Sequence, residues 1–257
     1  MPTKTFLHSH LTSVIIQTTV NAANYSVNFS PGTPTQAAPF FGRADVALYV
    51  TVGLNPAPGE FQSGRWPSTP LLPADHLDRL LEYFTNPLVR YYASWFDPWD
   101  DALKHIGHSY LSDTADTAHF DLSPRATIPV SNCPDRRVFV QMVDADIGQF
   151  FALLKESSKI RGLLAAGSSW GITRKNTVGA VYLDRIIRDA APLYGFQLGN
   201  SRVFQKSGPR IALHDLTGPS GETIPLFFCG ASPSARSPGD LAAAVKGCMA
   251  LLKTAGF

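Results

Sequence analysis

The alternation of apolar runs with amphipathic segments most constrains the fold of this chain. Residues 45–53 ("DVALYVTVG"), 160–167 ("IRGLLAAG") and 223–230 ("TIPLFFCG") are apolar runs suited to strands buried on both faces. Further segments predict a short strand at 118–129 that breaks at Pro124, a hairpin at 202–216, and helices at 73–86, 144–158, 177–195 and 237–256. Alternating strands and helices predict an α/β fold, which we expect to be a three-layer α/β/α structure around a central, mostly parallel, four-stranded sheet.

We expect one α/β domain over residues 45–257, because 257 residues with 44% hydrophobic content can bury a full core. Residues 21–44 mix Asn, Ser, Pro and Gly without a clear period. Residues 1–44 are therefore expected to form an N-terminal arm packed on the domain.

Charge and cysteine content exclude several classes of protein. A formal net charge of +2 is too small to indicate nucleic-acid binding by itself. Three widely spaced cysteines without a CxxC pair argue against a disulfide framework, a zinc site or an iron–sulfur cluster. No apolar run approaches the length of a membrane span, and the N-terminus lacks a convincing signal sequence. We therefore expect a cytoplasmic protein that does not interact with a membrane. We also expect it to be a monomer and to use no metal or cofactor.

Unusual loops follow the predicted strands. They are "GLNPAPGEF", "DLSPRAT", "GSSWG" and "GASPSARSP". Ligands of α/β sheets gather at the carboxyl ends of the strands, so these four loops predict one site on one edge.

The loop "GLNPAPGEF" is not a phosphate cradle, because it lacks the GxxxxGK[ST] order and its prolines cannot donate backbone hydrogen bonds. The prolines stiffen the loop, and a stiff loop can hold the Asn55 carboxamide against a water or a substrate. The alternative is a turn in which Asn55 satisfies only local backbone groups.

Four short motifs, three of them in these loops, resemble motifs of the uracil-DNA glycosylase superfamily. "GLNPAPGEF" is similar to its first motif, in the form found in the single-strand-selective and mismatch-specific branches, and "SGRWPS" is similar to the segment that follows. "DLSP" resembles the segment that recognises the base edge, and "SPSARSP" resembles the DNA-inserting loop. Order and spacing agree over roughly residues 45 to 250.

The resemblance implies a base-flipping enzyme that breaks an N-glycosidic bond. Asn55 would position the attacking water. Trp66, or Phe61 as the second choice, would stack on the flipped base, and the ring that is not used would pack the loop. No lysine stands in a motif position for a Schiff base, so release of the base by water, leaving an abasic site, is expected.

Two departures from the family pattern suggest a substrate other than uracil. Asp121 stands where a uracil-reading member has Asn, and an ionised carboxylate only accepts hydrogen bonds, as from the 4-amino group of cytosine. Alternatively, Asp121 caps a loop or pairs with Arg125. Ala57 replaces the Tyr that excludes C5 substituents. Together they suggest a cytosine with a C5 substituent, such as the hydroxymethylated or glucosylated bases of certain phage genomes, and a role in phage defence.

A third departure weakens the expected catalysis. Ser232 aligns with the family His that stabilises the departing base, and a neutral hydroxyl is a weaker donor. His119 and His214 are possible substitutes, although a lone histidine is more often structural.

Contacts with DNA are predicted from the basic and polar loop residues. Ser234 and Arg236 would lie in the inserting loop, and Arg174 and Lys175 would bind the backbone. For Lys175 an ordinary solvated charge is nearly as plausible.

Three functional hypotheses follow. The first is a monofunctional DNA glycosylase that acts on a modified cytosine. The second is a repair glycosylase for uracil or other deaminated bases, with Asp121 protonated or turned away. The third is a noncatalytic protein that binds modified DNA.

Overall fold

The computed structural model describes residues 2–20, 37–56, 58–61, 65–67, 69–127, 135–173, 175–199, 202–203, 210–230 and 237–257. Its strands are β1 (Phe40–Gly42), β2 (Tyr49–Gly53), β3 (Thr117–Asp121), β4 (Gly162–Ala166), β5 (Ser168–Ile172), β6 (Val178–Tyr182), β7 (Gln197–Leu198), β8 (Arg202–Val203), β9 (Arg210–Thr217) and β10 (Thr223–Gly230). Its helices are α1 (Lys4–Val20), α3 (Pro73–Leu81), α4 (Ala93–His105), α5 (Arg136–Asp146), α6 (Gly148–Glu156), α7 (Leu183–Ala190), α8 (Ser237–Gly247) and α9 (Met249–Thr254), with 3-10 turns η2 (Pro58–Phe61) and η4 (Ala191–Tyr194).

The main sheet is mixed. Its described strands number eight, in the order β1-β3-β2-β4-β10-β9-β7, with β8 paired to β9. Strands β3, β2, β4 and β10 run parallel to one another, whereas β1 pairs antiparallel with β3, β9 with β10, and β7 and β8 with β9. The prediction of an α/β fold is confirmed. The prediction of a four-stranded sheet is wrong, because antiparallel strands extend the parallel centre on both sides.

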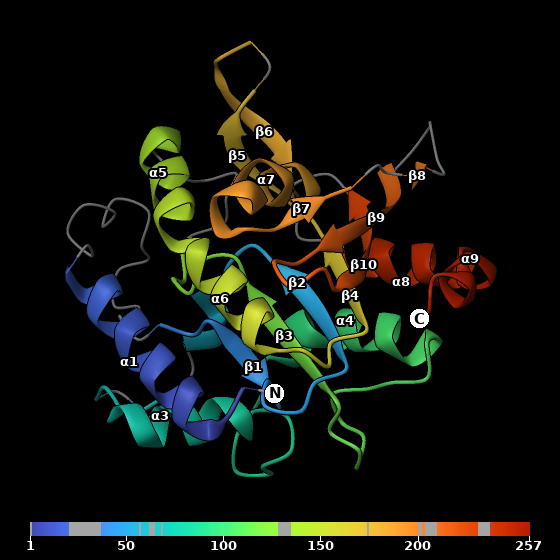
Figure 1. The fold of residues 1–257 in the computed structure, drawn as a ribbon. Helices are drawn as coiled ribbons and strands as arrows, with labels where there is room; N and C mark the ends of the chain where they lie inside the picture. Colours follow the sequence, from blue (N-terminus) through green and yellow to red (C-terminus); the bar gives the residue numbers. More distant parts are fainter. Residues whose placement is uncertain are drawn as a thin grey trace.

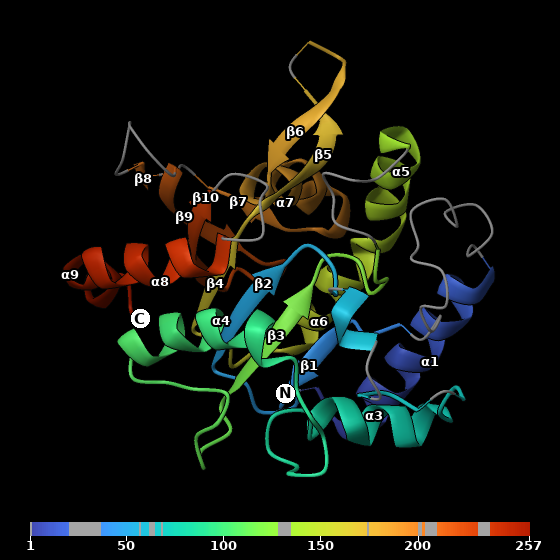
Figure 2. The ribbon, with the colours of Figure 1, turned by 180° about the vertical axis from the view of Figure 1, so that it is seen from behind.

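Helices cover both faces of this sheet. Figures 1 and 2 show α6 in front of one face and α4 with α8 in front of the other. The α8 helix contacts β4, β10 and α4. Strand β2 is buried throughout, because its β-branched and apolar residues lie in the middle of the sheet between these layers.

The N-terminal segment contributes to the sheet and to the core. Strand β1 pairs with β3, with Phe41 opposite His119, so the sheet begins before the expected boundary at residue 45. Helix α1 lies beside α3 (Figure 1) and buries Leu7 and Leu11 completely. Residues 21–36 lie outside the described part of the chain.

The segment 177–195 is only partly helical, which corrects the sequence prediction. Strand β6 pairs antiparallel with β5 and helix α7 begins only at Leu183. "TVGAVY" therefore forms one arm of a hairpin, which its β-branched residues favour. Figure 1 shows this hairpin projecting from the rest of the molecule.

Candidate functional site

The ends of β2 and β3 bring Asn55 and Asp121 into neighbouring segments. Asp121 ends β3 opposite Gly53, the last residue of β2. The pairing continues past the strands, because the Leu122 amide donates to the Gly53 carbonyl at 3.1 Å and the Ser123 amide donates to the Leu54 carbonyl at 2.9 Å. The two loops thus leave the sheet edge together, as the prediction of one site at this edge requires.

Asn55 connects the two loops. Its side-chain Nδ2 donates to the Arg125 carbonyl at 3.0 Å, to Thr127 Oγ1 at 3.0 Å and to the Pro56 carbonyl at 3.2 Å. Two carbonyl partners fix the orientation of the amide, because only its nitrogen can donate. Among the described residues, no group donates a hydrogen bond to the Asn55 side-chain oxygen, so that oxygen is available to a water or a ligand.

The Asp121 carboxyl is fully buried. Neither of its oxygens has a hydrogen-bond partner among the described residues. Burial raises the pKa of the Asp121 carboxyl above its ordinary value, and the nearby His119 opposes this shift. Apart from the approach of His119 Nε2 to Oδ1 at 3.3 Å, the described residues bring no donor close to this carboxyl. Because a buried carboxylate is stabilised by further hydrogen bonds, Asp121 can accept one from a group outside the described residues.

A buried polar chain positions Asp121. His119 Nε2 lies 3.3 Å from Asp121 Oδ1, and His119 Nδ1 lies 2.7 Å from Thr51 Oγ1. Thr51 in turn is hydrogen-bonded to the Tyr110 hydroxyl. His119, which the sequence suggested as a possible catalytic substitute, is itself fully buried and contacts the carboxyl rather than solvent.

Gly53 gives Asp121 and His119 the space that they occupy. A Cβ at position 53 would lie 2.8 Å from both Asp121 Oδ1 and His119 Nε2, closer than real Cβ contacts. Gly53 opens the "GLNPAPGEF" motif, but the sequence alone indicated no role of its own for it. A glycine that ends an apolar strand is the signal of such a close approach.

Arg125 does not pair with Asp121, contrary to the alternative interpretation of the sequence. Its Nε lies 2.8 Å from Asp146 Oδ2, and its NH1 donates to the Thr18 carbonyl at 2.8 Å. Ser123 Oγ donates to Asp146 Oδ2 at 2.6 Å. The loop after β3 is therefore anchored to α5 and α1, and Asp121 is left out of this ion pair.

The predicted stacking rings lie in the core. Trp66 and Phe61 are each 5% exposed, and their ring centroids lie 5.4 Å apart. Trp66 also packs against His76 and lies under the Arg79 guanidinium, while its Nε1 donates to Glu60 Oε1 at 2.8 Å. Both rings thus pack the loop in this conformation, and stacking of either ring on a base requires the loop to open.

The other predicted site residues are divided between described and undescribed parts of the chain. Lys175 is exposed in the turn of the β5–β6 hairpin. His214 is buried against Asp184. Ala57, Arg174, Ser232, Ser234 and Arg236 lie outside the described residues.

Neither a metal-binding cluster nor a membrane-spanning helix is found among the described residues. No cluster of three or more His, Cys, Asp or Glu side chains there could hold a metal ion. None of the described helices combines the length and the apolar character needed to cross a membrane. Comparison of the chain with protein-family models, with curated proteins and with solved structures finds no match.

Proposed function

We propose that this protein is a monofunctional DNA glycosylase that removes a C5-substituted cytosine. The observation that carries this proposal is the buried Asp121 carboxyl, whose oxygens accept no hydrogen bond from a described residue, at the edge from which the Asn55 loop leaves. The 4-amino group of cytosine is a donor that would satisfy this carboxylate. Uracil has a carbonyl at the same position and would be repelled by the ionised form.

Asn55 supports the same proposal through its side-chain oxygen, which accepts no hydrogen bond from a described residue. Its nitrogen is held by the two loops, so the oxygen can orient a water without reorganisation. In the reaction, the C1′–N1 bond breaks and its electron pair goes to N1 of the base. The water oxygen bonds to C1′, and a proton from this water is transferred, directly or through solvent, to the released base. Asn55 is neutral and cannot take up that proton, so we expect slow turnover.

Tolerance of a C5 substituent depends on Ala57, which is smaller than the aromatic residue of the strict uracil enzymes that the motif resembles. We expect the C5 substituent of the substrate to be a hydroxymethyl or glucosyl group. Such cytosines occur in certain phage genomes, so removal of them would act against phage DNA.

The test is base excision by the purified full-length protein. DNA containing cytosine, 5-hydroxymethylcytosine, glucosylated 5-hydroxymethylcytosine or uracil is incubated with the protein, treated with hot alkali to cleave abasic sites, and separated on a denaturing gel. We expect strand scission at a C5-substituted cytosine, reduced about a hundredfold in Asn55→Ala. Absence of scission on every substrate contradicts the proposal.

Asp121→Asn separates recognition of cytosine from recognition of uracil. Asn can donate to O4 and accept from N3–H, so the variant should gain uracil excision and lose activity on modified cytosine. A second candidate, a uracil glycosylase with protonated Asp121, is favoured by the raised pKa that burial gives this carboxyl. It predicts uracil excision by the unmodified protein and loss of that excision in Asp121→Asn.

A noncatalytic DNA-binding protein would give a third result. Tight binding of modified or abasic DNA without product, undiminished in Asn55→Ala, would support that function and contradict both glycosylase proposals. Thermal unfolding of each variant shows whether a loss reflects the site or the fold, because Asn55 also connects two loops.

A further inference from the structure

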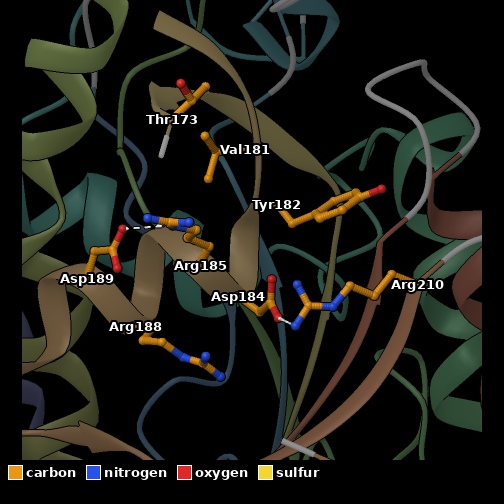
Figure 3. Close-up of a pocket in the computed structure, with 8 residues that line it drawn as sticks. All are labelled: Thr173, Val181, Tyr182, Asp184, Arg185, Arg188, Asp189 and Arg210. Atoms are coloured by element: carbon orange, nitrogen blue, oxygen red, sulfur yellow. Dashed lines mark hydrogen bonds and ion pairs between the residues drawn. The ribbon is translucent and has the colours of Figure 1, made fainter. Parts of the chain in front are cut away.

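A recess lies at the base of the β5–β6 hairpin. Its volume is about 520 Å³, and residues of the hairpin, of α7 and of β9 line it. Figure 3 shows Arg185, Arg188 and Arg210 around this space, with Tyr182 at its side. The recess therefore brings three guanidinium groups together in a chain whose formal net charge is only +2.

The carboxylates in the recess do not neutralise all three arginines. Asp184 Oδ2 lies 2.9 Å from the Arg210 guanidinium, and Arg185 lies 3.2 Å from Asp189 (Figure 3). Among the described residues, Arg188 has no carboxylate partner. One positive charge in the recess is thus available to an anion.

His214 shows why Arg188 keeps its charge available. His214 Nε2 lies 3.0 Å from Asp184 Oδ2, and the Arg188 guanidinium lies 3.2 Å from His214 Nδ1. Since arginine can only donate, Nδ1 must accept and Nε2 must carry the proton. In this arrangement His214 donates to Asp184 and accepts from Arg188, so it holds the Arg188 side chain without cancelling its charge.

Tyr182 provides an aromatic surface beside these cations. It is 39% exposed, although its ring packs edge-on against Phe228 at 6.0 Å and lies over Gly230, where a Cβ would approach it to 3.0 Å. The Arg210 guanidinium lies 5.9 Å from the ring centroid. An exposed ring supported on one side and flanked by arginine is the arrangement on which bases stack in proteins that bind single strands.

The recess lies on the same edge of the sheet as Asn55 and Asp121. Arg210 pairs with Gly230, the last residue of β10, and β10 is parallel to β4, β2 and β3 in turn. The carboxyl ends of these strands therefore share one edge, with Asp121 toward one side and Arg210 toward the other. A single strand of nucleic acid running along this edge would pass both.

We propose that this recess binds one nucleotide of single-stranded DNA outside the reacting base, with its phosphate at Arg188 and its base on Tyr182. The inference rests on the proposed function for its choice of DNA as the ligand. Arg185 and Arg210, already paired with carboxylates, add to the positive potential around the phosphate. The bound nucleotide would help to hold the strand while the target base is turned toward Asp121.

Fluorescence anisotropy with a labelled oligothymidylate about twelve nucleotides long, over a range of KCl concentrations, tests the recess. Tyr182→Ala should weaken binding about tenfold with little change in salt dependence, and Tyr182→Phe should bind as the unmodified protein does. Arg188→Ala should weaken binding and lower the slope of log K against log salt by about 0.7, as expected for one phosphate contact to a single strand.

Arg161→Ala is the matched control. Arg161 is exposed and directly precedes β4, at the amino end of the parallel strands and so on the opposite edge. Equal weakening by Arg161→Ala and Arg188→Ala would overturn the inference, as would unchanged binding in both Tyr182→Ala and Arg188→Ala. Circular dichroism and thermal unfolding confirm that each variant is folded.

The outcomes also separate this inference from the proposed function. Binding that depends on Tyr182 and Arg188, without excision of any base, supports the recess and contradicts the glycosylase. Excision of modified cytosine with binding that is indifferent to both residues supports the glycosylase and overturns the recess.

Discussion

At the scale of single residues, Glu60 is a buried acid whose titration should be visible in the stability of the protein. It is 1% exposed and accepts hydrogen bonds from Tyr83 and Trp66. Burial raises the pKa of Glu60 to about 7 from an ordinary 4.5. Between pH 4.5 and about 7, Glu60 is therefore protonated in the folded protein but ionised in the unfolded chain. The free energy of unfolding should fall as the pH rises through this window, by about 3 kcal/mol in total.

Glu60→Gln should remove this pH-dependent decrease in the free energy of unfolding, because glutamine has nearly the same volume and does not titrate. Urea unfolding at several pH values measures it, with the exposed Glu156→Gln as a control that should retain the dependence of the unmodified protein. The same slope in Glu60→Gln and in the unmodified protein would show that Glu60 is not the titrating group.

At the scale of elements, the Arg125–Asp146 pair holds the loop after β3 to α5 and α1. The side chains of Arg125 and Asp146 are 4% and 1% exposed. Removing one partner of a buried pair leaves the other charge uncompensated, so Asp146→Ala should lower the free energy of unfolding by about 3–5 kcal/mol. Asp78→Ala, which breaks the exposed pair with Lys4, should change it little. Chemical denaturation compares the two, and similar small effects would contradict the anchoring role.

At the scale of the whole molecule, α1 should unfold together with the sheet. Leu11 is fully buried in the main core, whereas Ile16 on the same helix is 59% exposed. Leu11→Ala should lower the free energy of unfolding by about 2–5 kcal/mol, and Ile16→Ala should have little effect. Unfolding followed by tryptophan fluorescence and by circular dichroism should give coincident transitions in the unmodified protein. A separate early transition sensitive to Leu11→Ala would show that α1 is an independent arm.

The parts of the fold that could be predicted from the sequence are those with a strong local pattern. The predicted strand 223–230 coincides with β10, and the predicted runs at 45–53 and 160–167 contain β2 and β4. Continuous apolar runs need burial on both faces whatever their neighbours are. Helix α4 was not predicted, because an internal Pro98 and several aromatic residues obscure its period.

The sequence by itself determined the buried parallel strands, the α/β class and the placement of Asn55 and Asp121 at the carboxyl ends of two strands. These features follow from local hydrophobic pattern and strand direction. Only the tertiary structure decided the order of the strands, the burial of Trp66 and the side chains that surround Asp121. Strand β1, for example, joins β3 across almost eighty residues of chain. Such pairing depends on contacts between distant segments. The buried Asp121 carboxyl without a described donor and the recess of Arg188 and Tyr182 arise from these contacts.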